Sequence, residues 1–156
     1  MTRPRTNLKL KLTTLSSLLV AGVILAGCGG GDDPEPEPGK QSLNLQTFTS
    51  PDGNIGCIAD DQMVRCDIRK KSWRVERDPQ CQLDYGNGLS VGTKGSGEVV
   101  CAGDTTLSDG PAVRHGSINM VGPFECESNE WGDTMRCENV HTSHGFELSG
   151  DQYELF

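Results

Sequence analysis

The chain has 156 residues, of which 34% are hydrophobic, so it has room for one small domain once any export segment is set aside. Its formal net charge of −8 argues against binding to nucleic acid or to anionic lipid head groups, because both would repel it.

The first 27 residues have the features of an export signal. Arg3, Arg5, Lys9 and Lys11 precede an uncharged apolar run over residues 15–26. This run is too short to span a bilayer, because a transmembrane helix needs about 20 apolar residues. We therefore interpret residues 1–27 as a signal peptide.

The end of this signal indicates lipidation. Leu25-Ala26-Gly27-Cys28 resembles the bacterial lipobox, in which small residues precede a cysteine that receives a diacylglyceryl group. We predict Cys28 as the lipidation site, with ordinary secretory cleavage as the alternative. Two or more acyl chains would anchor the protein stably to the extracytoplasmic face of the cell membrane. Cleavage removes four basic residues, which lowers Lys+Arg from 14 to 10 against 22 acids and leaves a net charge of −12.

A short tether is predicted after the signal. Residues 28–40 comprise the lipidated Cys28 and a segment of Gly, Pro, Glu and Asp that ends in Lys40 and has no apolar side chains other than proline. Such a composition favours an extended, solvated backbone. The extracytoplasmic domain is therefore assigned to residues 41–156.

This domain has the sequence pattern of an all-β fold. Short apolar runs alternate with turn residues, as in 51–54, 84–88 and 94–97, and no stretch shows a sustained helical period. The pattern predicts a small sandwich or barrel built from cysteine-linked hairpins.

Six cysteines remain after Cys28, an even number in an exported domain, which predicts three disulfides. Eight residues separate Cys57 from Cys66, and ten separate Cys126 from Cys137. An even separation allows the two members of a pair to lie opposite each other in a hairpin with a symmetric loop. We therefore pair each set locally.

The remaining pair is Cys81 with Cys101. Their separation of nineteen residues is odd and requires a bulge or an odd loop, consistent with the glycine-rich residues 92–97. The cysteines contain no Cys-x-x-Cys pair and no histidine at ligand spacing, so no metal site is expected.

The two outer hairpins resemble each other. Val64-Arg65-Cys66-Asp67 parallels Met135-Arg136-Cys137-Glu138, which indicates a weak internal repeat. We expect the two hairpins to pack their apolar faces together, with most of the core volume supplied by aromatic residues. These are Trp73, Tyr85, Phe124, Trp131, Phe146 and Tyr153.

The order of motifs also indicates a family. The motifs are the segments 48–57 (FTSPDGNIGC), 65–67 (RCD), 81–86 (CQLDYG), 101–105 (CAGDT) and 144–149 (HGFELS). Together they resemble an uncharacterised family of secreted and lipid-anchored actinobacterial proteins, a domain of unknown function. The resemblance covers residues 48–156 and brings no activity, substrate or catalytic residue with it. It implies a high-GC Gram-positive source and a position on the outer face of the plasma membrane.

No catalytic motif is present among the common hydrolase and nucleotide-binding patterns, and no thiol remains free to act as a nucleophile. The best constellation that can be assembled is His115, His141 and His144 with Asp104 and Ser149. Nothing in the sequence brings these residues together, so no catalytic residue is predicted. The segment Asp104-Thr105-Thr106 is predicted to close a turn.

A basic segment stands out on this acidic domain. Its charged residues surround Trp73 and form a possible binding site for a teichoic acid, a phospholipid anion or an acidic partner. They are Arg69, Lys70, Lys71 and Arg74. The alternative, which we favour, is a solvated edge strand that its charges protect from pairing.

These observations favour a membrane-anchored, non-enzymatic module that binds an envelope protein or a cell-wall ligand, without a cofactor. Two alternatives are open. A rigid disulfide-bonded β domain also suits an inhibitor of an extracellular hydrolase, because its loops lose little entropy on binding. The third possibility is a small hydrolase that uses the histidines.

Overall fold

The computed structural model describes residues 45–108 and 110–156, and these residues form ten β-strands and no helix. The all-β class is therefore confirmed. The predicted signal peptide, Cys28 and the tether lie outside the described residues. The strands are β1 (Gln46–Thr49), β2 (Ile55–Ala59), β3 (Met63–Ile68), β4 (Asp84–Gly92), β5 (Glu98–Ala102), β6 (Ile118–Val121), β7 (Phe124–Ser128), β8 (Thr134–Asn139), β9 (His144–Ser149) and β10 (Tyr153–Leu155).

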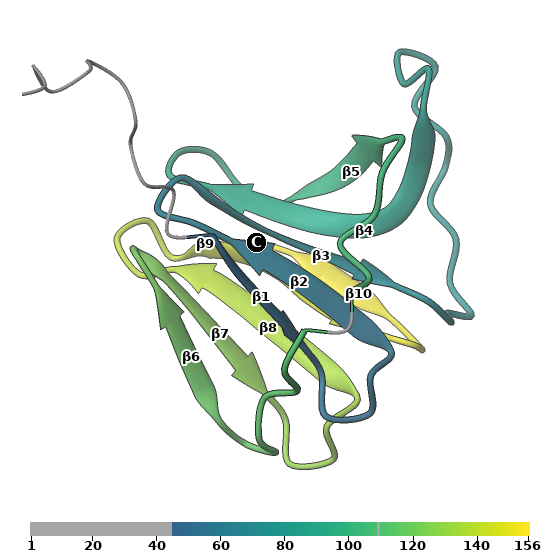
Figure 1. Ribbon diagram of the computed structural model, residues 1–156. Coiled ribbons are helices and arrows are strands. Elements are labelled where there is room, and N and C mark those ends of the chain that lie inside the picture. Colours follow the sequence, from purple (N-terminus) through teal and green to yellow (C-terminus); the bar gives the residue numbers. More distant parts are fainter. Residues whose placement is uncertain (1–44, 109) are drawn as a thin grey trace, which may run out of the picture. The chain divides into compact units, whose positions relative to one another are not determined.

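The strands form a sandwich of two five-stranded sheets, in the orders β1-β2-β3-β4-β5 and β10-β9-β8-β7-β6. Every neighbouring pair is antiparallel, and consecutive strands are joined directly, so each sheet is a simple meander. Figure 1 shows the sheet of β1 to β5 packed over the sheet of β6 to β10, with β4 and β5 curling away. The short connections between strands follow from the frequent turn residues of the sequence.

The core lies between the two sheets because side chains alternate along each strand. In β3, Val64 and Cys66 are fully buried on the core face, whereas Arg65 points to the outer face of the sheet. Phe124 and Phe146 from the second sheet are also fully buried in the same cluster. Burial of each such side chain contributes about 1.5–3 kcal/mol.

Three disulfides link the domain in the pairs expected from the spacing. Cys57 faces Cys66 across β2 and β3, and Cys126 faces Cys137 across β7 and β8, each pair with Cα atoms 4.1 Å apart. The Cys66 and Cys137 sulfurs lie 3.9 Å from each other, so the two cross-strand disulfides meet in the core. A third bond joins Cys81, ahead of β4, to Cys101 in β5.

The two sheets repeat one another beyond the cysteines. In the first sheet, Asp67 of β3 lies opposite Gly88 of β4. In the second sheet, Glu138 of β8 lies opposite Gly145 of β9. The weak sequence repeat thus corresponds to equivalent positions in two sheets of the same topology.

The structure corrects the prediction that Trp131 belongs to the core. Trp131 is 78% exposed, at the tip of the loop between β7 and β8. Phe48, which the prediction did not include, is 3% exposed and takes a place in the core. The tip of a hairpin loop lies beyond the last paired residues, so Trp131 projects past the sheet rather than into it.

The basic segment is not an edge strand. The described residues between Ile68 and Asp84 form bends, turns and irregular backbone, and the first sheet continues instead with β4. Contacts with the β9–β10 turn hold the segment outside the ladder. Ser72 donates its backbone N–H to the Gly150 carbonyl at 2.8 Å, and Trp73 donates its indole N–H to the Ser149 carbonyl at 2.8 Å.

The irregularity expected between Cys81 and Cys101 lies mainly inside β4. Tyr85 pairs with Cys101, whereas Leu89 pairs with Val99, so the β4 backbone carries extra residues at this point. Gly86 there has a positive φ of 80°, a conformation that favours glycine. The glycine-rich residues 92–97 close the β4–β5 hairpin.

Candidate functional site

The most elaborate polar site lies on the outer face of the first sheet, where β3 places Arg65 and Asp67 side by side. Strand alternation directs both side chains away from the core. Gly88 on β4 leaves room for the Asp67 carboxylate, since a Cβ at Gly88 would come within 2.0 Å of the Asp67 Oδ1 atom. The alternation of side chains along β3 and the glycine opposite Asp67 together create space for a buried ion pair.

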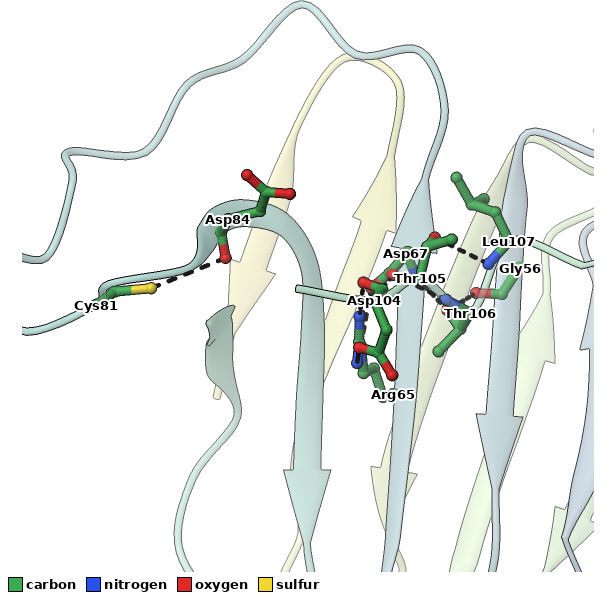
Figure 2. A network of polar contacts seen from close by, with 9 residues as sticks. All are labelled: Gly56, Arg65, Asp67, Cys81, Asp84, Asp104, Thr105, Thr106 and Leu107. Atoms are coloured by element: carbon green, nitrogen blue, oxygen red, sulfur yellow. Dashed lines mark hydrogen bonds and ion pairs between the residues drawn. The ribbon is translucent and has the colours of Figure 1, made fainter. Parts of the chain in front are cut away.

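Arg65 forms ion pairs with two carboxylates through its guanidinium group, as Figure 2 shows. Its Nε and Nη2 atoms donate to Asp67 Oδ1 and Oδ2 at 3.0 and 2.8 Å. Its Nη1 atom donates to Asp104 Oδ1 at 2.8 Å, and Nη2 also donates to the Asp104 carbonyl at 2.9 Å. The fork of donors on arginine suits such a bidentate arrangement.

The segment around Thr106 covers Asp67. The Thr106 N–H donates to Asp67 Oδ2 at 2.9 Å, and the Thr106 hydroxyl accepts the Asp67 N–H at 3.0 Å. The same hydroxyl donates to the Gly56 carbonyl at 2.6 Å. Asp67 is therefore 2% exposed and fully hydrogen-bonded. The turn predicted at residues 104–106 is present, since the Thr105 hydroxyl accepts the Leu107 N–H at 3.1 Å, and this segment lies over the sheet as a strap.

Opposite charge sets the electrostatics of this network. Burial lowers the pKa of Arg65, but the hydrogen bonds and charges of Asp67 and Asp104 outweigh it, so the Arg65 pKa is raised. The hydrogen bond and the charge of Arg65 lower the pKa of the Asp104 carboxyl. Both groups thus stay charged over the neutral range.

A pocket of about 390 Å³ opens above the ion pair. Ile68, Val100, Ala102 and Leu107 give it an apolar wall, and the ion-paired residues form part of its lining. The other polar groups of the lining are Arg69, Asp84, Asn87 and Thr105. This combination suits a ligand group with a short apolar stem and a hydrogen-bond donor or positive charge at its end.

The basic segment is divided between two roles. The Lys71 ammonium donates to the Gly86 carbonyl and lies 3.9 Å from the centre of the Trp73 ring, and burial lowers its pKa. The Trp73 ring in turn packs against Tyr153, with ring centres 4.6 Å apart. Arg69, Lys70 and Arg74 are exposed. Lys71 and Trp73 therefore serve the fold, and only the exposed members present charge to solvent.

The histidines do not assemble into one site. His115 lies against the Glu130 carbonyl, at 3.2 Å, beside the β7–β8 loop. His141 and His144 are exposed around the β8–β9 turn. Asp104 is bound to Arg65, and Ser149 exchanges hydrogen bonds with Gln152. Five pockets among the described residues have no histidine in their linings.

The Arg65 network was not predicted, although the sequence contains a signal for it. Arg65 and Asp67 flank a core cysteine, and Arg136 and Glu138 do the same in the second sheet. Opposite charges at the positions before and after a buried strand residue predict an ion pair on the outer face of that strand. Asp104 could not be added in this way, because only the folded strap brings it close.

Residues 40–156 match the sequence profile of a family described as a family of unknown function (DUF6636). Comparisons with curated proteins and with solved structures found no match. Within the described residues, no helix is long and apolar enough to cross a membrane. The same part of the chain contains no cluster of histidine, cysteine and acidic side chains suited to a metal ion.

Proposed function

The chain belongs to this family of unknown function, so the site itself has to indicate a role, and we propose that the protein is a lipid-anchored binding module of the cell envelope. In this proposal Cys28 attaches it to the extracytoplasmic face of the membrane. Residues 29–40 act as the tether, and the pocket above Arg65 and Asp67 receives a group of an envelope protein or of the cell wall.

The pocket is the observation that carries this proposal. Its floor is an ion pair whose groups are occupied with one another, so Arg65 stabilises the shape of the site. Asp84, exposed at the start of β4, lines the same pocket and brings a carboxylate to this surface. Such a site can recognise a ligand by the shape of its apolar wall and by the charge of its polar lining.

The disulfides support the proposed location. Three of them in a domain of this size are typical of proteins that work outside the cytoplasm. They also keep the pocket walls in place, since Cys101 of β5 is linked to Cys81 and its neighbours Val100 and Ala102 line the pocket. A preformed pocket loses little conformational entropy on binding.

Co-sedimentation tests the proposal. The full chain, solubilised in detergent, is mixed with insoluble cell walls and separately with bead-coupled envelope proteins of the source organism. We expect binding to at least one fraction and a loss of about tenfold in affinity on Asp84→Asn, the size of one charged hydrogen bond. Glu154→Gln removes the same charge from an exposed position on β10 and should bind as wild type.

Two outcomes would contradict this proposal. The first is the absence of binding to every envelope fraction. The second concerns the histidines: the folded, correctly located His115→Gln, His141→Gln and His144→Gln variants should retain function. If one of these variants completely failed to complement a strain that lacks the protein, a hydrolase would be favoured instead.

A further inference from the structure

A second surface of the domain has the chemistry of a ligand site, and its main hollow shares no lining residue with the Arg65 pocket. We call it the loop end; it comprises residues 50–54, 69–73, 129–134 and 149–152. Hydrogen bonds join these segments: Asp52 N–H to the Gly132 carbonyl at 3.3 Å, Asn54 Nδ2 to the Lys70 carbonyl at 3.0 Å, and Ser72 N–H to the Gly150 carbonyl at 2.8 Å. The β1–β2 and β7–β8 loops lie at the bottom of Figure 1.

Trp131 is the prominent residue of the loop end. It is 78% exposed, more than any other large hydrophobic residue among those described. Exposure of a tryptophan ring forgoes the favourable transfer of its large apolar surface from water. The exposure therefore calls for a reason other than stability.

The loop that presents Trp131 is rigidly held. Asn129 Oδ1 accepts the N–H groups of Gly132 and Asp133 at 2.7 and 3.1 Å, and its Nδ2 donates to Asp133 Oδ1 at 2.7 Å. Gly132 has a φ of 81° and packs so tightly that a Cβ would lie 2.7 Å from Pro51 and from His115. The backbone at Trp131 is thus held at the tip of the loop before any ligand arrives.

A hollow of about 560 Å³ lies beside the indole ring. Apart from Trp131 and the backbone of Gly150, its lining consists of hydroxyl, amide and carboxylate side chains. They belong to Asn54, Asn129, Asp133, Thr134, Ser149, Asp151 and Gln152. The amide of Gln152 makes no side-chain hydrogen bond within the described part of the chain, and Asp151 and Gln152 are both exposed.

The carboxylate of Asp133 is available as an acceptor at any pH near neutrality. Hydrogen bonds from Asn129 and, more weakly, Thr134 lower its pKa despite a small opposing effect of burial. A hollow with a fixed acceptor at Asp133 and the amide of Gln152 next to an aromatic face matches a pyranose ring. One face of such a ring is formed by C–H groups that stack on indole, and its rim carries hydroxyls that both donate and accept.

From this geometry we propose that the loop end binds a polysaccharide chain of the cell wall, with one sugar ring stacked on Trp131 and its hydroxyls bonded in the adjoining hollow. The inference rests on the proposed envelope function and adds a ligand class to it. A membrane surface fits less well, because Asp133 and Asp151 would be repelled by anionic lipid and would lose their hydration. A second hollow, lined by Asn54, Arg69 and Lys70, continues the surface.

Affinity electrophoresis tests the inference with the full chain. Native gels contain one of four purified probes: a soluble glucan, a mannan, an arabinogalactan or solubilised peptidoglycan glycan strands. We expect at least one probe to retard the wild type, Trp131→Ala to lose about tenfold or more in affinity, and Trp131→Phe to keep an intermediate affinity. Ile118→Ala removes another exposed apolar side chain, 57% exposed on β6, and should be retarded as wild type.

The inference fails if no probe retards the wild type, or if Trp131→Ala binds the retarding probe as tightly as wild type. It also fails if the Trp131-dependent ligand in envelope fractions proves to be a protein, shown by loss of binding after protease treatment of the fraction. These outcomes are separable from failure of the proposed function, because envelope binding that depends on Asp84 and persists in Trp131→Ala would leave that function standing.

Discussion

Arg65 and Arg136 occupy equivalent positions in the two sheets but have different surroundings. Arg65 pairs with Asp67, and their side chains are 12% and 3% exposed. Arg136 pairs with Glu138, with side chains 39% and 29% exposed, and its guanidinium lies 4.2 Å from the centre of the Phe156 ring. The same motif therefore makes a buried ion pair in one sheet and a surface one in the other.

This difference predicts unequal effects of two matched substitutions. Arg65→Ala leaves the Asp67 carboxylate buried without its counter-charge, so we expect a loss of about 3–5 kcal/mol in the free energy of unfolding. Arg136→Ala removes an exposed pair and a cation–π contact and should cost about 1–2 kcal/mol. Denaturant titration of both variants measures this, and equal losses would contradict the account of the Arg65 network.

A pH dependence follows from the lowered pKa of Asp104. Because the folded-state pKa lies below the unfolded one, ionisation of Asp104 stabilises the fold fully above about pH 4, and this contribution is lost as the pH falls through the folded value. Asp104→Asn should lower stability at neutral pH and make the acid limb of the stability curve shallower. Urea titrations between about pH 2 and pH 7 test the sign; a steeper acid limb in Asp104→Asn would be inconsistent with it.

At the scale of strands, the two sheets share a glycine at an equivalent position. The fourth strand of each has a glycine opposite the acidic residue of the third, Gly88 against Asp67 and Gly145 against Glu138. A Cβ at Gly145 would lie 2.2 Å from the Cys137 carbonyl oxygen, as close as the contact at Gly88. At Gly88 the Asp67 carboxylate occupies the space that a side chain would need, whereas at Gly145 the β8 backbone and the Phe156 ring occupy it.

Alanine substitutions test how tightly these two glycines are packed. Gly88→Ala and Gly145→Ala should each lower the free energy of unfolding by about 1–3 kcal/mol, because the neighbouring strand or, at Gly88, the Asp67 carboxylate must move. Gly92→Ala is the control on the same strand as Gly88, since its nearest neighbours lie at 3.7 Å, and it should change stability by less than about 0.5 kcal/mol. Wild-type melting temperatures for the first two variants would show that the strands adjust easily.

At the scale of the whole molecule, the proposed function depends on anchoring by Cys28. Cys28→Ser removes the thiol that would form the thioether to lipid, so the variant should move from the membrane fraction to the soluble exported fraction or accumulate unprocessed. Cell fractionation, with metabolic labelling by a palmitate analogue, provides the measurement. Membrane partitioning and labelling as strong as in the wild type would refute lipidation at Cys28.

Local features of the sequence determined the fold class and the disulfide pairs that the structure contains. Turn residues at short intervals excluded long helices, and even separations placed Cys57 opposite Cys66 and Cys126 opposite Cys137. These features are predictable because strand alternation and hairpin geometry act between residues close in the chain. The repeat of Arg, Cys and an acid was visible for the same reason.

Contacts between distant segments decided the rest. Asp104 meets Arg65 across 39 positions of the chain, and the segment around Trp73 meets the β9–β10 turn across 76. The aromatic character of Trp131 alone predicted a core position, yet the tertiary structure holds this residue in solvent through Asn129, Gly132 and the β1–β2 turn. Hydrophobicity predicts burial only on average, whereas the exposure of one side chain depends on which surfaces the completed fold brings against it.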